Sequence, residues 1–237
     1  MPYRSLNIQE AARMLGADAR RVERMAQRGV IPCQKVAGQF RFNRAEMTEW
    51  LQENLGTMNH RDLAEVDAGI TEQRQAEEDE LIVAPLLRFE AITTDLDART
   101  KPSVIRALLE LAQRTGCVLD EQELLGATMH REELCSTALE GGIAIPHSRR
   151  PLPYAISEPI LVVARTTQPI VFGAPDGKLT QLFFLTVSLD DHHHVHLLAR
   201  LCRMLHDERF VARLQGAESP EETMDLMKAR EHEVLAE

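Results

Sequence analysis

The residues with the clearest capacity for chemistry lie in one short stretch, EGGIAIPHSRR, at positions 140–150. Its apolar residues 143–145 predict a short buried strand, which ends in Pro146 and His147. An imidazole is a nucleophile near neutral pH, and Arg149 and Arg150 are cations that can hold an anion beside it. A histidine at a strand end is more often structural than functional, so the choice between chemistry and packing depends on the rest of the chain.

A second group of titratable side chains is the run HHHVH at positions 192–196. A catalytic zinc ion needs about three converging ligands, and four histidines in five residues cannot all converge on one ion. The sequence has no HExxH pattern and no closely spaced cysteine pair. We therefore predict no metal site and no cofactor, and we expect DDHHHV to be a solvated loop that holds one functional histidine.

The composition of the whole chain limits where this chemistry takes place. The chain has 237 residues, enough for one large domain or two smaller ones. Its four cysteines are far apart, which is typical of reduced thiols in a cytoplasm. The N-terminus has no apolar signal-peptide core, and the apolar runs are far shorter than the ~18 residues of a membrane span. We expect a cytoplasmic protein without a membrane segment.

Charge and pattern divide the chain into three segments. Residues 1–55 carry nine Lys and Arg against six Asp and Glu, so this segment is basic although the whole chain has a net charge of −10. Residues 56–84 contain eight Asp and Glu and predict an acidic linker with some helical content. Residues 85–237 alternate strand-like and helix-like runs, which predicts an α/β or α+β domain.

Residues 1–55 have the spacing of a helix-turn-helix. Asn7 and Asp18 are predicted to cap two short helices, which end at Gly16 and Gly29. Two strand-like pieces around an Ala-Gly turn follow, and Asn43 is predicted to cap a third helix. Such a frame can place its second helix in the major groove of DNA and its hairpin on the phosphate backbone.

The candidate DNA-binding residues are the basic side chains of the second helix and the hairpin. By themselves, these arginines fit an ordinary solvated helix face, but the frame around them favours DNA binding. One such unit makes few phosphate contacts, so useful affinity requires a homodimer or a second protein. The predicted DNA-binding residues are Arg20, Arg21, Arg24, Arg28, Lys35 and Arg41.

The segment LNIQEAARMLG…VERMAQRGVIPCQKVAGQFRFNRAEMTEWL resembles the excisionase-type, MerR-like winged helix domain over about residues 5–52. The resemblance rests on the motif RGVIP…G…R…EWL. Such domains usually bind DNA, although some small versions only mediate protein contacts.

The C-terminal segment resembles the type-2 enzyme IIA domain of the bacterial phosphoenolpyruvate-dependent phosphotransferase system, in its fructose, mannitol and nitrogen-regulatory branch. The matching pieces are REELCSTALEGGIAIPHSR, VFGAPDGKLTQLFFLTVSL and HVHLLARLCRML, in that order within about residues 84–235. The resemblance implies an α/β (α+β) fold with a mixed sheet flanked by helices. The sequence departs from the family pattern at residues 138–140, where glycine and asparagine are common, and at Ser148, which replaces a frequent glycine.

This resemblance implies that His147 accepts a phosphoryl group from a phosphohistidine carrier of the HPr or NPr type. Arg131 stands at the family's arginine position and is implied to hold phosphate oxygens. His194 is implied to donate a hydrogen bond to the phosphoryl group, and Thr137 is implied to shape the pocket.

The combination of a DNA-binding domain with a phosphoryl-acceptor domain predicts a regulator whose activity depends on phosphorylation of His147. The acidity of the linker also suggests that the basic segment 1–55, called the head below, docks within the chain when DNA is absent. Two alternatives remain open: a carrier that passes phosphate to a sugar-specific IIB partner, and a regulator that binds target proteins and never DNA.

Overall fold

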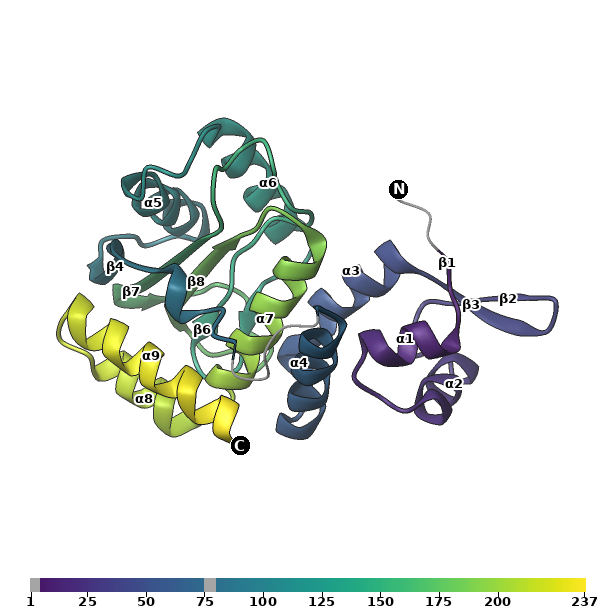
Figure 1. Cartoon of the computed structure of the whole chain (residues 1–237). Helices are drawn as coiled ribbons and strands as arrows, with labels where there is room; N and C mark the ends of the chain where they lie inside the picture. Colours follow the sequence, from purple (N-terminus) through teal and green to yellow (C-terminus); the bar gives the residue numbers. More distant parts are fainter. Residues whose placement is uncertain (1–4, 75–79) are drawn as a thin grey trace.

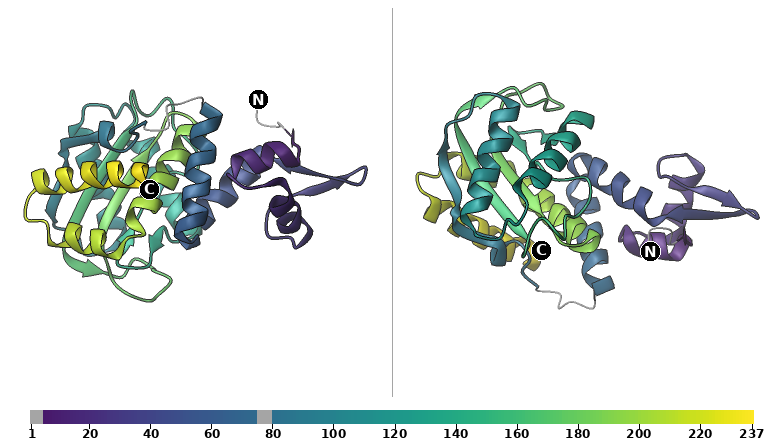
Figure 2. Two further views of the ribbon diagram at one scale, coloured as in Figure 1. Left: turned by 60° about the horizontal axis from the view of Figure 1, so that its bottom comes forward. Right: turned by 90° about the horizontal axis from the view of Figure 1, so that it is seen from above.

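The computed structural model describes residues 5–74 and 80–237, which form a small N-terminal part and a larger α/β part (Figure 1). The N-terminal part projects from one side of the α/β part, and its hairpin points away from it (Figure 2). Helix α4 (His60–Arg74) lies between the two.

The N-terminal part is a helix-turn-helix with a small antiparallel sheet in which β3 is the central strand. Helix α3 follows the hairpin and leads toward the α/β part. Its elements in chain order are β1 (Ser5–Leu6), α1 (Ile8–Met14), α2 (Ala19–Gln27), β2 (Gln34–Val36), β3 (Gln39–Asn43) and α3 (Arg44–Asn54).

Local side-chain chemistry explains where these elements begin. The side chains of Asn7, Asp18 and Asn43 accept hydrogen bonds from backbone amides in the first turns of α1, α2 and α3, which confirms the three predicted caps. Ala37 and Gly38 both have positive φ, as a tight two-residue hairpin turn requires.

The segment that the sequence predicted as an acidic linker contains a packed helix. Besides α4 it holds two short 3-10 turns, η1 (Leu55–Thr57) and η2 (Ala84–Leu86). The apolar side chains Leu63, Val66 and Ile70 of α4 are buried, and α4 contacts both α1 and α7. The acidic run at 76–80 lies outside the described residues except for Glu80.

The α/β part is built on a mixed sheet with strand order β4-β7-β8-β6-β5. The pairs β4–β7 and β6–β8 are parallel, and the pairs β7–β8 and β5–β6 are antiparallel. This confirms the predicted mixed sheet. The elements are β4 (Leu87–Leu96), α5 (Lys101–Arg114), α6 (Glu121–Leu134), β5 (Ala138–Leu139), β6 (Ile143–Ala144), β7 (Ile160–Ile170), β8 (Thr180–Val187), α7 (Asp191–Leu205), α8 (Glu208–Gly216) and α9 (Pro220–Ala236).

Alternation along the strands gives the sheet two apolar faces. On β8, Leu182 and Phe184 join one core while Phe183 and Leu185 join the other. Helices α5 and α6 cover one face, and α7, α8 and α9 cover the other (Figure 1).

The histidine run was expected to be a solvated loop, and this expectation is wrong. The carboxylate of Asp190 accepts hydrogen bonds from the backbone amides of His192 and His193 and so caps α7. All four histidines therefore lie in the first two turns of a helix.

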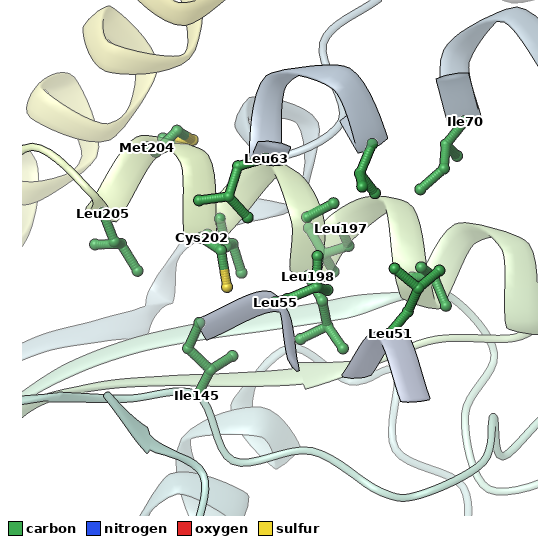
Figure 3. Close-up of a cluster of buried hydrophobic side chains, with 14 of the residues drawn as sticks. Leu51, Leu55, Leu63, Ile70, Ile145, Leu197, Leu198, Cys202, Met204 and Leu205 are labelled. Carbon is green, nitrogen blue, oxygen red and sulfur yellow. The ribbon is translucent and has the colours of Figure 1, made fainter. Parts of the chain in front are cut away.

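The core that underlies α7 continues into the N-terminal part. Leu51 and Leu55, at the end of α3, lie beside Leu198 of α7 and Ile145 of the central sheet (Figure 3). At the other side of α4, a Cβ added to Gly16 would overlap the Glu65 carbonyl, so this close approach requires glycine. Among the residues described, no helix combines the length and apolar character needed to cross a membrane.

Candidate functional site

His147 is held at the carboxyl end of β6 by backbone pairing. It forms a parallel bridge with Thr186 of β8, whose amide donates to the Pro146 carbonyl at 3.1 Å. Its side chain is buried, with 4% of the residue exposed. Nδ1 lies 2.7 Å from the carbonyl oxygen of Ile145. Because a carbonyl oxygen only accepts, Nδ1 carries the proton and the neutral ring keeps its lone pair on Nε2.

The surroundings keep this imidazole neutral. Burial, and then the positive charge of Arg131, lower the pKa of His147 from 6.5 to about 4, against a smaller opposite effect of the bond to Ile145. At neutral pH the ring is therefore unprotonated at Nε2. This atom is buried and has no hydrogen-bond partner among the described residues. The result is a nucleophilic nitrogen with an unused lone pair.

His194 faces His147 from the N-terminal turn of α7. The centroids of the two rings are 5.4 Å apart and their planes are inclined by 58°. His194 is fully buried, and neither ring nitrogen has a hydrogen-bond partner within the described chain. Burial, followed by the charges of His147 and His193, holds the pKa of His194 well below its usual range. A neutral His194 still has one ring N–H to donate.

Arg131 brings a positive charge to the two imidazoles from the last turn of α6. Its side chain is buried and donates to the Cys135 carbonyl at 2.8 Å, which fixes the guanidinium near the end of the helix. Its charge affects the pKa of both His147 and His194. The structure thus brings three predicted site residues together in one buried cluster suited to receive an anion.

Thr137 lies beside this cluster without bonding to either histidine. Its hydroxyl donates to the Glu132 carboxylate at 2.5 Å, and the same carboxylate accepts from Lys101 at 2.7 Å. Its carbonyl accepts from the Ile145 amide at 3.1 Å, which joins the end of α6 to the strand that presents His147. Lys101 and Glu132 were not singled out from sequence, because nothing in their spacing indicates this pairing.

The predicted DNA-binding side chains differ in their surroundings. Arg20 and Arg24 of α2 and Arg28 at its C-cap are exposed. Lys35 is exposed on the hairpin, with Nζ 5.7 Å from the centroid of the Phe40 ring. Arg41 is half-buried on β3 and donates to the Gln39 side chain at 3.2 Å.

Arg21 points to a different surface from that of these exposed residues. Its guanidinium forms ion pairs with Asp62 and Glu65 of α4, both at 2.7 Å. The hydrogen bond to Asp62 raises the pKa of Arg21 above its ordinary value. A DNA phosphate that contacted Arg21 would have to compete with two carboxylates of the same chain.

A buried ionic cluster connects α4 with α7, and no sequence pattern indicated it. Asp67 is 1% exposed, and its carboxylate lies 2.7 Å from Arg200, 3.1 Å from Arg203 and 3.2 Å from His196. Burial raises the pKa of Asp67, but the bond from His196 and the charge of Arg200 outweigh burial and leave it lowered. Asp67 thereby fixes the helix that carries His194.

A second unpredicted contact joins α3 to the loop after His147. Glu49 of α3 forms an ion pair with Arg149. Arg149 was singled out from sequence as a candidate cation near His147, whereas its partner lies in the other predicted domain. Within the described residues, no group of three or more His, Cys, Asp or Glu side chains is arranged to hold a metal ion.

Comparisons with known proteins identify the two parts separately. Residues 85–230 match the family described as "Phosphoenolpyruvate-dependent sugar phosphotransferase system, EIIA 2", and residues 5–55 match a helix-turn-helix domain family. The PTS system fructose-specific EIIA component of Haloferax volcanii is 31% identical over 147 residues, which cover 61% of this chain and 94% of the relative. The nitrogen regulatory protein of Bradyrhizobium diazoefficiens is 29% identical over 138 residues, which cover 57% and 87%.

Solved structures show the same fold for the α/β part. IIA mannitol from Escherichia coli superposes with a TM-score of 0.52 at 26% identity, over 60% of this chain and 98% of that chain. The nitrogen regulatory protein IIA-Ntr from Neisseria meningitidis superposes with a TM-score of 0.57 at 24% identity, over 62% and 99%, a likeness of fold alone. The matches confirm the two resemblances predicted from sequence.

Proposed function

This chain belongs to the EIIA 2 family of the phosphoenolpyruvate-dependent sugar phosphotransferase system, with a helix-turn-helix domain N-terminal to it, and from this premise we propose that His147 is a phosphoryl acceptor whose state regulates a DNA-binding head. The proposed donor is a histidine-phosphorylated carrier of the HPr or NPr type. The observation that supports this most strongly is the unpartnered Nε2 of His147 in a buried cluster with His194 and Arg131.

The chemistry proposed is an in-line transfer between two imidazoles. The lone pair of His147 Nε2 attacks phosphorus, and a new N–P bond forms as the N–P bond to the donor ring breaks. The electron pair of the broken bond stays on the donor nitrogen. The Ile145 carbonyl keeps the proton on Nδ1 throughout, so the attacking nitrogen needs no base to remove a proton.

Two groups stabilise the negative charge of the transferred phosphoryl group. Arg131 supplies a fixed guanidinium, and His194 supplies a ring N–H to a phosphoryl oxygen. Because both are already buried and held by their helices, little reorganisation is needed when the group arrives.

DNA binding is assigned to the exposed face of α2 and to the hairpin. Arg20 and Arg24 of α2 and Arg28 at its C-cap recur every four residues, and they lie on the part of the chain that projects away from the α/β part (Figure 2). Such a row can neutralise successive phosphates. Since one head offers few such contacts, we propose that the chain acts on DNA as a homodimer or with a second protein.

The test of phosphoryl transfer is intact mass after incubation with phosphoenolpyruvate, enzyme I and an HPr-type carrier, repeated with an NPr-type carrier. We expect the wild-type chain to gain one acid-labile phosphoryl group. His147→Ala should gain none, and His232→Ala, which removes an exposed histidine of α9, should behave as wild type. Equal labelling of His147→Ala and wild type would reject His147 as the acceptor.

A further inference from the structure

The contact between Glu49 and Arg149 joins the DNA-binding head to the phosphoryl-acceptor loop. Glu49 lies in the middle of α3, and Arg149 follows His147 by two residues. Both side chains are partly exposed, at 36% and 46%. The pair is therefore accessible to a partner that approaches His147, and it is held less tightly than a buried pair.

Apolar contacts place α3 along the same edge of the α/β part. Thr48 and Leu51 of α3 line a narrow gap with His192 and Val195, which flank His194 on α7. Below them, Leu51 and Leu55 share a core with Ile145, two residues before His147 (Figure 3). The head thus rests on both elements that form the site, the end of β6 and the start of α7.

A residue that departs from the family pattern takes part in this contact. Leu139, within the unusual stretch at 138–140, packs so closely on Gly56 that a Cβ at position 56 would overlap its side chain. Leu139 also lines, with Leu55 and Met58, a groove of about 710 Å³ between the head and the sheet edge. This places one of the sequence differences from other family members at the contact with the head.

Transfer to His147 requires Nε2 to become accessible to the donor. Nε2 has no solvent-exposed surface, yet the donor phosphorus must come within bonding distance of it. Part of the surface around His147 must therefore move when a carrier binds, and α3 is the outside element whose Glu49 pairs with Arg149, two residues after His147.

We propose that the Glu49–Arg149 pair is a latch that holds α3 over the surface that the phosphohistidine carrier must use. Once the phosphoryl group is on His147, Arg149 leaves Glu49 and binds that group. This proposal rests on the proposed function of His147. The phosphoryl group carries nearly two negative charges against one for the carboxylate, so it attracts the guanidinium more strongly and repels Glu49. Two residues of chain span at most about 7 Å, a distance that an arginine side chain can bridge.

The two residues of the latch should respond differently to neutral substitution. Glu49→Gln opens the pair and leaves Arg149 free, so we expect His147 to be phosphorylated about two- to fivefold faster than in wild type, as the strength of a partly exposed ion pair allows. Arg149→Gln also opens the pair but removes the cation. We expect it to shift the phosphoryl equilibrium back toward the carrier by a similar factor, which Glu49→Gln should not do.

The matched control is Glu53→Gln, which removes the same charge one turn further along α3 from an exposed position. The measurement is single-turnover transfer from the phosphorylated carrier, followed by intact mass. If Glu49→Gln is no faster than Glu53→Gln, the latch is rejected. If Arg149→Gln has the same rate and equilibrium as Glu49→Gln, the transfer of Arg149 to the phosphoryl group is rejected.

Hydrogen exchange separates a failed latch from a failed acceptor. The amides of α3 in unphosphorylated Glu49→Gln should exchange faster than those in wild type and Glu53→Gln, because the latch no longer holds the helix. If the wild-type chain takes no phosphate from any carrier but this difference is present, the proposed function fails and the latch stands as a structural contact. Equal exchange in the three proteins rejects the latch.

Discussion

The two sets of basic side chains in this molecule have opposite physical settings. Arg20 and Arg24 of α2 and Arg28 at its C-cap are exposed to solvent, whereas Arg131 is buried beside His147. Exposed charges act over a Debye length and add up, so each contributes modestly and salt weakens all of them. A buried charge acts on one neighbour in a medium of low dielectric constant, where its effect is large and hard to replace.

If the proposed function is correct, one acidic chain holds two sites for phosphate that work in different ways. The head should bind a regular row of phosphates through many weak contacts that tolerate single substitutions. The acceptor site should bind one phosphoryl group through a few buried groups whose geometry is fixed. Substitutions that separate these two modes can be ranked by the size of their expected effects.

The largest effect is expected at the buried arginine. Arg131→Ala removes the cation beside His147, and we expect the rate of phosphoryl transfer to fall by about 10²–10³-fold, as for the loss of one preorganised charge-stabilising group. Arg131→Lys should recover part of the rate because it keeps the charge. Single-turnover transfer from the phosphorylated carrier measures the rates of both variants. A rate within threefold of wild type for Arg131→Ala would show that Arg131 does not hold the phosphoryl group.

The next largest effect is expected on stability, from two aspartates of the same helix. Asp67→Ala removes the carboxylate that buried Arg200 and His196 share and leaves Arg200 only the more distant Glu231 at 3.3 Å, so we expect the free energy of unfolding to fall by about 3–5 kcal/mol. Asp62→Ala breaks a partly exposed pair with Arg21 and should cost about 1 kcal/mol or less. Urea denaturation measures the free energy of unfolding of both variants. Equal losses for the two variants would contradict the contrast between buried and exposed pairs.

A smaller effect is expected on DNA affinity. Replacing Arg20, Arg24 and Arg28 together by Ala should weaken binding to a duplex by about 10–100-fold at moderate salt and reduce the slope of log K against log salt by about three. The matched control replaces Arg106, Arg114 and Arg209, three exposed arginines of the α/β part. Fluorescence anisotropy at several salt concentrations measures both. An equal loss in the two triple variants would reject α2 as the DNA-binding surface.

The smallest effect at neutral pH is expected from the titration of His147. Its pKa of about 4 in the folded protein lies below the ordinary 6.5, so the unfolded chain binds more protons between these values. The contribution of this group to stability is therefore complete above pH 6.5 and is lost as pH falls toward 4, by at most about 3 kcal/mol. Ring signals of His147 in NMR spectra should not move between pH 8 and 5.5. Titration near 6.5 would contradict a buried, neutral ring.

Features that depend on neighbouring residues could be predicted from sequence. Each cap needs only one side chain and the amides two or three positions later, as at Asn7, Asp18 and Asn43. The same holds for the hairpin turn around Ala37 and Gly38. The start of α7 at Asp190 could have been predicted from such a cap as well, but the polar histidine run was expected to be a loop.

Features that depend on distant residues could not be predicted in this way. Asp67 meets Arg200 across 133 positions, and the acidic composition of its segment favoured a linker over a packed helix. The pair of Glu49 and Arg149 crosses between the two predicted domains. His147 stood out in the sequence itself, the roles of His194 and Arg131 were implied by a family resemblance, and the burial of all three was visible only in the fold.

The most direct test compares the DNA affinity of one protein in its two states. Wild type and His147→Ala are incubated with phosphoenolpyruvate, enzyme I and carrier, freed of the reagents, and titrated with a duplex pool at fixed salt. We expect phosphorylation to change the dissociation constant of wild type by at least about fivefold, the lower end of ordinary coupling between sites, and to leave His147→Ala unchanged. Identical binding curves for phosphorylated and unphosphorylated wild type would contradict the coupling of His147 to the DNA-binding head.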